Sequence, residues 1–67
     1  GETPAKAVER IRAEAARARI EAGDDSIDSV ARRVGFMDSE RMRRAFLRVY
    51  GQPPQALRRA ARNAALA

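Results

Sequence analysis

The chain lacks cysteine, histidine and tryptophan, and only three of its 67 residues are aromatic. Without cysteine it can form neither a disulfide framework nor a thiolate metal site. Without histidine it has no imidazole base, and the loop carboxylates Asp24, Asp25 and Asp28 lack partners that would complete a nucleophile, a base or a metal cage. The sequence therefore predicts that the protein is not an enzyme and holds no metal or cofactor.

Long apolar runs are also absent. No stretch approaches the roughly 20 apolar residues of a membrane span, and the N-terminus lacks the basic and apolar regions of a signal peptide. No stretch alternates with period two, and β-branched residues never cluster, so strands are not expected. We therefore expect a cytoplasmic all-α protein that makes no membrane contact and forms one small domain of marginal stability.

The segment 27–51 holds two short helical patterns separated by a glycine-bearing turn. Ser26 and Asp38 are suitable N-caps, and Gly35 and Gly51 can supply the positive φ that ends each helix. Apolar residues recur at helical spacing in both patterns, at Ile27, Val30, Ala31 and Val34 and then at Met42, Ala45, Phe46, Val49 and Tyr50. Two such helices joined by a short turn predict a helix-turn-helix.

A longer helix is expected before this motif and a shorter one after it. Thr3 can cap a helix that starts at Pro4 and runs to about Ala22. Its apolar stripe comprises Val8, Ile11, Ala15, Ala18 and Ala22, with Ala16 and Ile20 beside it. We expect the helix-turn-helix to cover only the C-terminal part of that stripe, which leaves Val8 and Ile11 in need of another partner.

The resulting fold is all-α and homeodomain-like. It consists of a long helix (residues 1–22) followed by a helix-turn-helix unit (residues 26–67), which closes with a short helix from about Pro54.

Positive charge is concentrated in the second half of the chain. Residues 1–31 carry five basic and seven acidic side chains, a net charge of −2. Residues 32–67 carry nine arginines against Asp38 and Glu40, a net charge of +7. This half is typical of a polyanion binder, and arginine suits bidentate recognition of phosphate and base edges.

The exposed face of the second motif helix carries the candidate recognition residues. With Met42 at the centre of the buried face, Glu40, Arg44 and Leu47 lie nearly opposite. An arginine fork can bond two edge acceptors of guanine, and a glutamate can accept from the amino group of cytosine. The candidate DNA base contacts are Ser39, Glu40, Arg41 and Arg44, with Ser39 nearest the sugar-phosphate edge.

Phosphate contacts are expected from two sources. The N–H groups at the start of the first motif helix, near Ser26 and Ile27, can hold a phosphate through the helix dipole. Further candidates are Arg32, Arg33, Arg43 and Arg48.

Four alternatives to double-stranded DNA also fit a cationic surface. The arginine-rich face could be solvated and laced with salt bridges, or a basic helical module could bind RNA, an acidic protein partner or a membrane surface. RNA modules usually stack bases on exposed aromatic side chains, whereas Phe36, Phe46 and Tyr50 all occupy expected core positions. A membrane-surface helix needs bulky apolar residues, whereas the last helix offers mostly alanine.

The sequence resembles the AraC/XylS family of transcription regulators over nearly its whole length. The resemblance is carried by Arg12-Ala13, Ala16 and Ile20, by Ile27-x-x-Val30-Ala31-x-x-Val34-Gly35-Phe36 and Phe46, and by Tyr50-Gly51-x-Pro53-Pro54 with Leu57-Arg58. Met42, Leu47, Leu57 and Arg19 depart from the usual residues, and the leucine at 47 removes one expected phosphate contact.

That resemblance implies a DNA-binding domain with two helix-turn-helix units joined by a long helix, of which this chain looks like the linker helix and the second unit. It also implies an upstream helix-turn-helix unit, a sensor domain and, for the full-length regulator, RNA polymerase as a partner. A Gly-x-x-Pro opening occurs at both Gly1 and Gly51, which agrees with a preceding motif that ends at Gly1.

Overall fold

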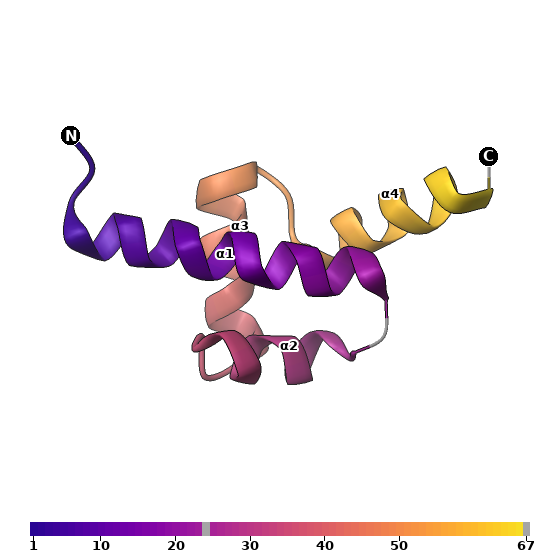
Figure 1. The fold of residues 1–67 in the computed structure, drawn as a ribbon, viewed down its shortest axis with the longest axis horizontal. Coiled ribbons are helices and arrows are strands. Elements are labelled where there is room, and N and C mark those ends of the chain that lie inside the picture. The colour runs from indigo at the N-terminus through magenta and orange to yellow at the C-terminus, as the bar shows by residue number, and fades with distance from the viewer. Residues whose placement is uncertain (24, 67) are drawn as a thin grey trace.

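The computed structural model describes residues 1–23 and 25–66, which form four helices (Figure 1). The helices are α1 (Pro4–Ala22), α2 (Ile27–Val34), α3 (Ser39–Tyr50) and α4 (Pro54–Leu66). These described ranges contain no strand, and the all-α prediction is confirmed. Asp24, a loop carboxylate of the sequence analysis, and Ala67, the last residue of the expected DNA-binding unit, lie outside the described residues.

Three helices begin where a side-chain oxygen accepts a hydrogen bond from a free backbone N–H group, and each of these three ends at a glycine with positive φ. The Thr3 hydroxyl accepts a hydrogen bond from the backbone of Lys6, and Ser26 and Asp38 cap α2 and α3 in the same way. Gly35, with φ +97°, and Gly51, with φ +71°, adopt the left-handed conformation that ends α2 and α3. The predicted limits of both motif helices are therefore confirmed.

α1 is the element against which the other three helices pack. It runs along the 39 Å length of the molecule and contacts all of them, while α3 crosses it steeply and α2 lies to one side (Figure 1). The core contains Ala13, Ala16 and Ile20 from α1, Val30, Ala31 and Phe36 from α2 and the turn, Met42, Ala45 and Phe46 from α3, and Leu57 from α4. Small alanine side chains at these crossings allow the helices to approach closely.

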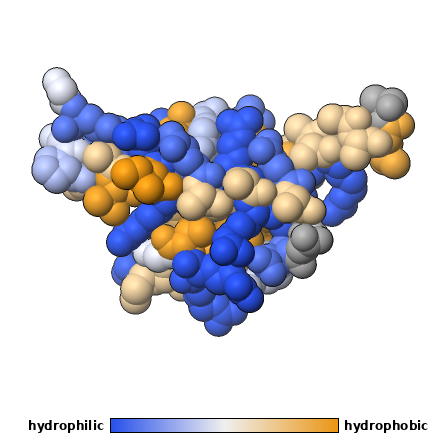
Figure 2. Space-filling model, viewed as in Figure 1, coloured by the Kyte–Doolittle hydropathy of each residue, from blue (hydrophilic) through white to orange (hydrophobic). Residues whose placement is uncertain are grey.

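The predicted packing face of α1 is wrong for its central stripe, although Ala16 and Ile20, expected beside that stripe, are buried. Ala15, Ala18 and Ala22 are exposed, and the buried stripe runs instead through Ala13, Ala16 and Ile20 on the opposite side of the helix. Alanine occurs on both sides of α1, so helical spacing could not distinguish them, and the bulkier Ile20 occupies the core. Figure 2 shows the exposed apolar stripe as a broken band along α1 on the side toward the viewer.

The expectation for the N-terminal part of that stripe is confirmed. Val8 is 44% exposed and Ile11 is 57% exposed, so the helix-turn-helix leaves both side chains in solvent. α1 therefore presents one apolar face to the core and a second one, on its other side, to solvent.

Arg58 of α4 holds together the corner where α1 leads into α2. Its guanidinium donates hydrogen bonds to the backbone carbonyls of Ile20 and Asp25. The Ile20 carbonyl belongs to the last turn of α1, where carbonyls lack helical partners. Leu57 and Pro54 are buried beside this contact. The first turns of α4 thus fix the place where α2 begins.

Met37, in the turn between α2 and α3, adopts φ +76° although it is not glycine. A left-handed conformation costs an ordinary L-residue roughly 1–2 kcal/mol, whereas asparagine tolerates it better. The side chain is 69% exposed, so little packing offsets this cost. We expect Met37→Asn to raise the free energy of unfolding by about 0.5–1 kcal/mol and the melting temperature by several degrees.

Met37→Ala serves as the matched control in thermal denaturation, because alanine also removes the methionine side chain but lacks the polar group with which asparagine bonds locally in the left-handed conformation. Equal melting temperatures for the asparagine and alanine variants would contradict this account.

Candidate nucleic-acid interface

α3 buries one face and leaves a cationic face in solvent. Met42, Ala45 and Phe46 are 0–1% exposed, and the ring of Phe46 meets that of Tyr50 edge-on at 5.2 Å. The exposed residues of the helix are Glu40, Arg41, Arg43, Arg44, Leu47 and Arg48, with Ser39 half-buried at its start. The structure therefore places the predicted base-contacting residues together at the N-terminal end of one helix.

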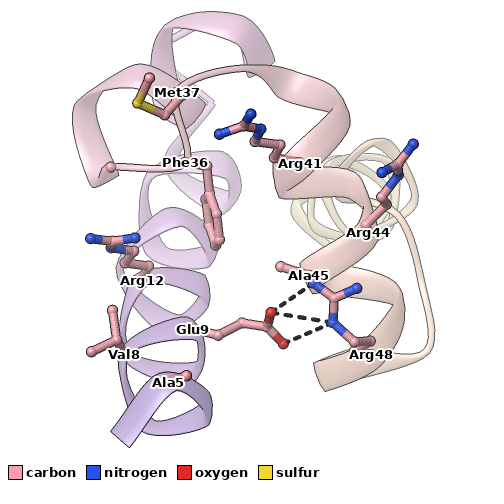
Figure 3. Close-up of a pocket in the computed structure, with 11 residues that line it drawn as sticks. Ala5, Val8, Glu9, Arg12, Phe36, Met37, Arg41, Arg44, Ala45 and Arg48 are labelled. Atoms are coloured by element: carbon pink, nitrogen blue, oxygen red, sulfur yellow. Dashed lines mark hydrogen bonds and ion pairs between the residues drawn. The ribbon is translucent and has the colours of Figure 1, made fainter.

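Two contacts from α1 hold the C-terminal end of α3. Arg48 donates three hydrogen bonds of 2.7–3.2 Å to the carboxylate of Glu9, as Figure 3 shows. These bonds lower the pKa of Glu9 below its ordinary value and raise that of Arg48. Arg17 lies over the ring of Tyr50, with its guanidinium carbon 4.9 Å from the ring centroid. Both contacts thus link the C-terminal end of α3 to the long helix, while the buried face of α3 sets its direction.

Glu40 organises the arginines at the start of α3. Its carboxylate accepts hydrogen bonds of 2.9 and 2.7 Å from Arg43 and one of 3.3 Å from Arg44. The hydrogen bonds from Arg43 are the main reason that the pKa of Glu40 falls to about 2. Glu40 is therefore ionised at neutral pH, and Arg43 and Arg44 are pre-ordered around it.

The predicted phosphate contacts do not form a single cluster. Ser26 and the half-buried Ile27 lie at the start of α2, where the Ser26 hydroxyl already accepts the backbone N–H of Ser29. Arg32 and Arg33, in the last turn of α2, pair with Asp28 at 2.6 Å and with Asp25 at 3.9 Å.

All four candidate phosphate-binding arginines (Arg32, Arg33, Arg43 and Arg48) have a carboxylate partner within 4.0 Å. At least 45% of each of these arginine side chains is exposed. Exposed pairs of this kind contribute little free energy, so a phosphate can replace the carboxylate.

A groove of about 580 Å³ opens between the N-terminal half of α1, the α2–α3 turn and α3 (Figure 3). It brings Arg41 and Arg44 of the predicted base-contacting set beside residues of α1, whereas Arg43 is not among its lining residues. The lining residues are Ala5, Val8, Glu9, Arg12, Gly35, Phe36, Met37, Arg41, Arg44, Ala45 and Arg48.

Sequence reasoning assigned no role in this site to Glu9, Arg12 or Met37. Glu9 and Arg48 are 39 positions apart, and helical spacing says nothing about such distant pairs. Met37 directly precedes the Asp38 N-cap, where apolar residues are common, so it gave no local signal either.

The described side chains include no group of three or more aspartate, glutamate, histidine or cysteine residues arranged to hold a metal ion. Within residues 1–23 and 25–66, no helix combines the length and hydropathy that a membrane crossing requires.

A short helix, a tight turn and a second helix with an exposed arginine-rich face define a helix-turn-helix unit, a class of DNA-binding domain. A family model described as "Helix-turn-helix domain" matches residues 1–60. The chain belongs to the AraC family of helix-turn-helix units, whose members are transcription regulators rather than enzymes.

Two curated relatives illustrate this membership. The HTH-type transcriptional regulator Rv1931c of Mycobacterium tuberculosis is 47% identical over 60 residues, which cover 90% of this chain and 23% of the relative. The HTH-type transcriptional activator RhaS of Pectobacterium carotovorum subsp. carotovorum is 38% identical over 58 residues, which cover 87% of this chain and 21% of the relative. The chain thus spans less than a quarter of each of these relatives. No solved structure matches it significantly.

Proposed function

We propose that this chain binds double-stranded DNA sequence-specifically, with α3 in the major groove, as the second helix-turn-helix unit of a transcription regulator. The observation that carries the proposal is the exposed face of α3, where Glu40, Arg41 and Arg44 lie together on a helix whose opposite side is buried. A helix of this kind fits the major groove, whose width of about 12 Å is close to a helix diameter.

The arrangement of aromatic side chains favours duplex DNA over RNA. Phe36 is 8% exposed and Phe46 is fully buried, while Tyr50 is half-buried and packs against Phe46. Single-stranded RNA is usually bound by stacking its bases on exposed aromatic rings, and these three rings offer no such platform. An acidic protein partner would use the same arginines, but it would not select among duplex sequences.

In this proposal Arg44 and Arg41 donate to guanine edges, Glu40 accepts from a cytosine amino group, and Ser39 lies near the sugar-phosphate edge. The phosphate contacts are the N–H groups at the start of α2, near Ser26 and Ile27, together with exposed arginines. Those arginines are Arg32, Arg33, Arg43 and Arg48. Each of these arginines would exchange its acidic partner for a phosphate oxygen when DNA binds.

We further propose that the chain works with an upstream helix-turn-helix unit and a sensor domain, and that the whole regulator contacts RNA polymerase. Support comes from the length of the relatives, which far exceeds that of this chain. The exposed Val8 and Ile11 on the N-terminal half of α1 offer a surface on which an upstream unit could pack.

The test begins with selection and sequencing of random-sequence duplexes retained by the chain. On the selected site, Arg44→Ala should weaken binding by about 1–3 kcal/mol and relax the preference at one base pair. The reason is that a bidentate arginine bonds the correct base and leaves its donors unpaired against a wrong one. Affinities for the site and its single-base variants, measured at one salt concentration, check this result.

Arg59→Ala, on exposed α4, removes the same charge away from α3 and should leave the base preferences unchanged. If Arg44→Ala weakens binding to every sequence equally, Arg44 is a phosphate contact. If the selection retains no preferred duplex, the proposed function itself is wrong.

A further inference from the structure

The groove between α1 and α3 carries more positive charge than the predicted contacts account for. Four arginines line it against the single carboxylate of Glu9. Three of these arginines already have acidic partners: Arg48 pairs with Glu9, Arg41 with Asp38 at 3.6 Å, and Arg44 with Glu40 at 3.3 Å. Arg12 of α1 differs from them, since no described acidic side chain lies within 4.0 Å of its guanidinium.

Arg12 is held in place by the turn that leads into α3. A β-carbon built on Gly35 would lie 3.1 Å from Nε and 3.3 Å from Cζ of Arg12, so the guanidinium lies directly against the glycine backbone. Figure 3 shows the Phe36 side chain between Arg12 on one side and Arg41 on the other.

The position of the groove relative to α3 indicates what fills it. If the outward face of α3 meets base edges, its two flanks face the sugar-phosphate strands on either side of the major groove. Arg41 and Arg48 lie on one of these flanks, between the outward face and the buried Ala45. The groove extends from that flank of α3 to α1. Arg12 is the cationic residue that α1 contributes to the lining of the groove.

We propose that this groove receives one sugar-phosphate strand of the DNA, and that Arg12 of the long helix binds a phosphate there. Polyanion chemistry suits the arginine-rich lining, and the apolar side chains of Ala5 and Ala45 suit the deoxyribose between phosphates. The inference rests on the proposed function, because it requires α3 in the major groove. It assigns to α1 a direct contact with DNA in addition to its structural role.

The experiment measures how the affinity of the 67-residue chain for a random-sequence duplex depends on salt. Arg12→Met keeps an unbranched stem over Gly35 and removes the charge. Loss of one phosphate contact should reduce the slope of log K against log salt by about 0.9. Between 50 and 200 mM salt, the wild type should then lose about 3.5-fold more affinity than the variant. Arg12→Lys should restore the slope, because an ammonium also pairs with phosphate.

Arg59→Met is the charge-matched control on exposed α4, and thermal denaturation of each variant shows whether the fold is retained. An unchanged slope for Arg12→Met overturns the inference and leaves the proposed function intact. A slope reduced equally by Arg59→Met also overturns it, because the effect would then report net charge. If the wild type binds no duplex at all, both proposals are wrong.

Discussion

Phe46→Ala should lower the free energy of unfolding by about 3–5 kcal/mol. Phe46 heads the largest fully buried side chains among the described residues, and its ring meets that of Tyr50 edge-on. Truncation of a buried phenylalanine to alanine typically costs about 3–5 kcal/mol. A domain of this size has roughly 3–10 kcal/mol in total, so this one substitution removes much or all of its stability.

Urea denaturation followed by helical circular dichroism measures this loss. Leu47→Ala is the matched control, because Leu47 is the next residue in α3 and is 41% exposed. It should change the free energy of unfolding by no more than about 0.5 kcal/mol. If both variants lose the same stability, the core is not organised around Phe46.

A chain extended upstream by the preceding helix-turn-helix unit should bind its selected site about 10²- to 10⁴-fold more tightly than the 67-residue chain. Two linked units bind as one, because the first contact places the second at a high effective concentration. The 19-residue α1 would join them as a stiff connector. It would place them about one DNA turn, or ~34 Å, apart in successive major grooves. Affinity for one selected site, measured at a single salt concentration, tests this expectation.

The stability of the extended chain provides an independent test at Ile11, which is 57% exposed here. In the 67-residue chain Ile11→Ala should have little effect, because the side chain packs against little and alanine favours helix. In the extended chain the same change should cost about 2 kcal/mol or more, because an upstream unit would bury Ile11. Equal effects in the two chains, or equal DNA affinities, would show that this unit acts alone.

The helix limits and the core of the motif could be predicted because they depend on local chemistry. The Ser26 and Asp38 side chains each accept a hydrogen bond from a backbone N–H only three residues further along the chain. Gly35 and Gly51 end their helices because each adopts a positive φ. The fully buried Met42 and Phe46 were recognisable because a spacing of four residues places both on one side of α3.

The packing of α1 could not be predicted, because its two sides are nearly equal in composition. Ala16 is buried while Ala15 and Ala18 are exposed, and only the tertiary arrangement distinguishes them. The same limit applies to the groove. Glu9 bonds Arg48, and Arg12 lies over Gly35, through contacts between segments far apart in sequence. Charge patterning identified the arginines of α3, but not the residues of α1 beside them.

Arg58 also determines how small a transplantable version of this motif can be. A peptide that stopped at Gly51 would retain both helices of the motif, yet it would lack the donor that bonds the carbonyls of Ile20 and Asp25. It would also lack the buried Leu57. Any graft of α2 and α3 onto another scaffold therefore has to carry the first turns of α4, or replace Arg58 with another donor at the α1–α2 corner. The smallest segment that can be transferred as a folded unit is therefore larger than the helix-turn-helix itself.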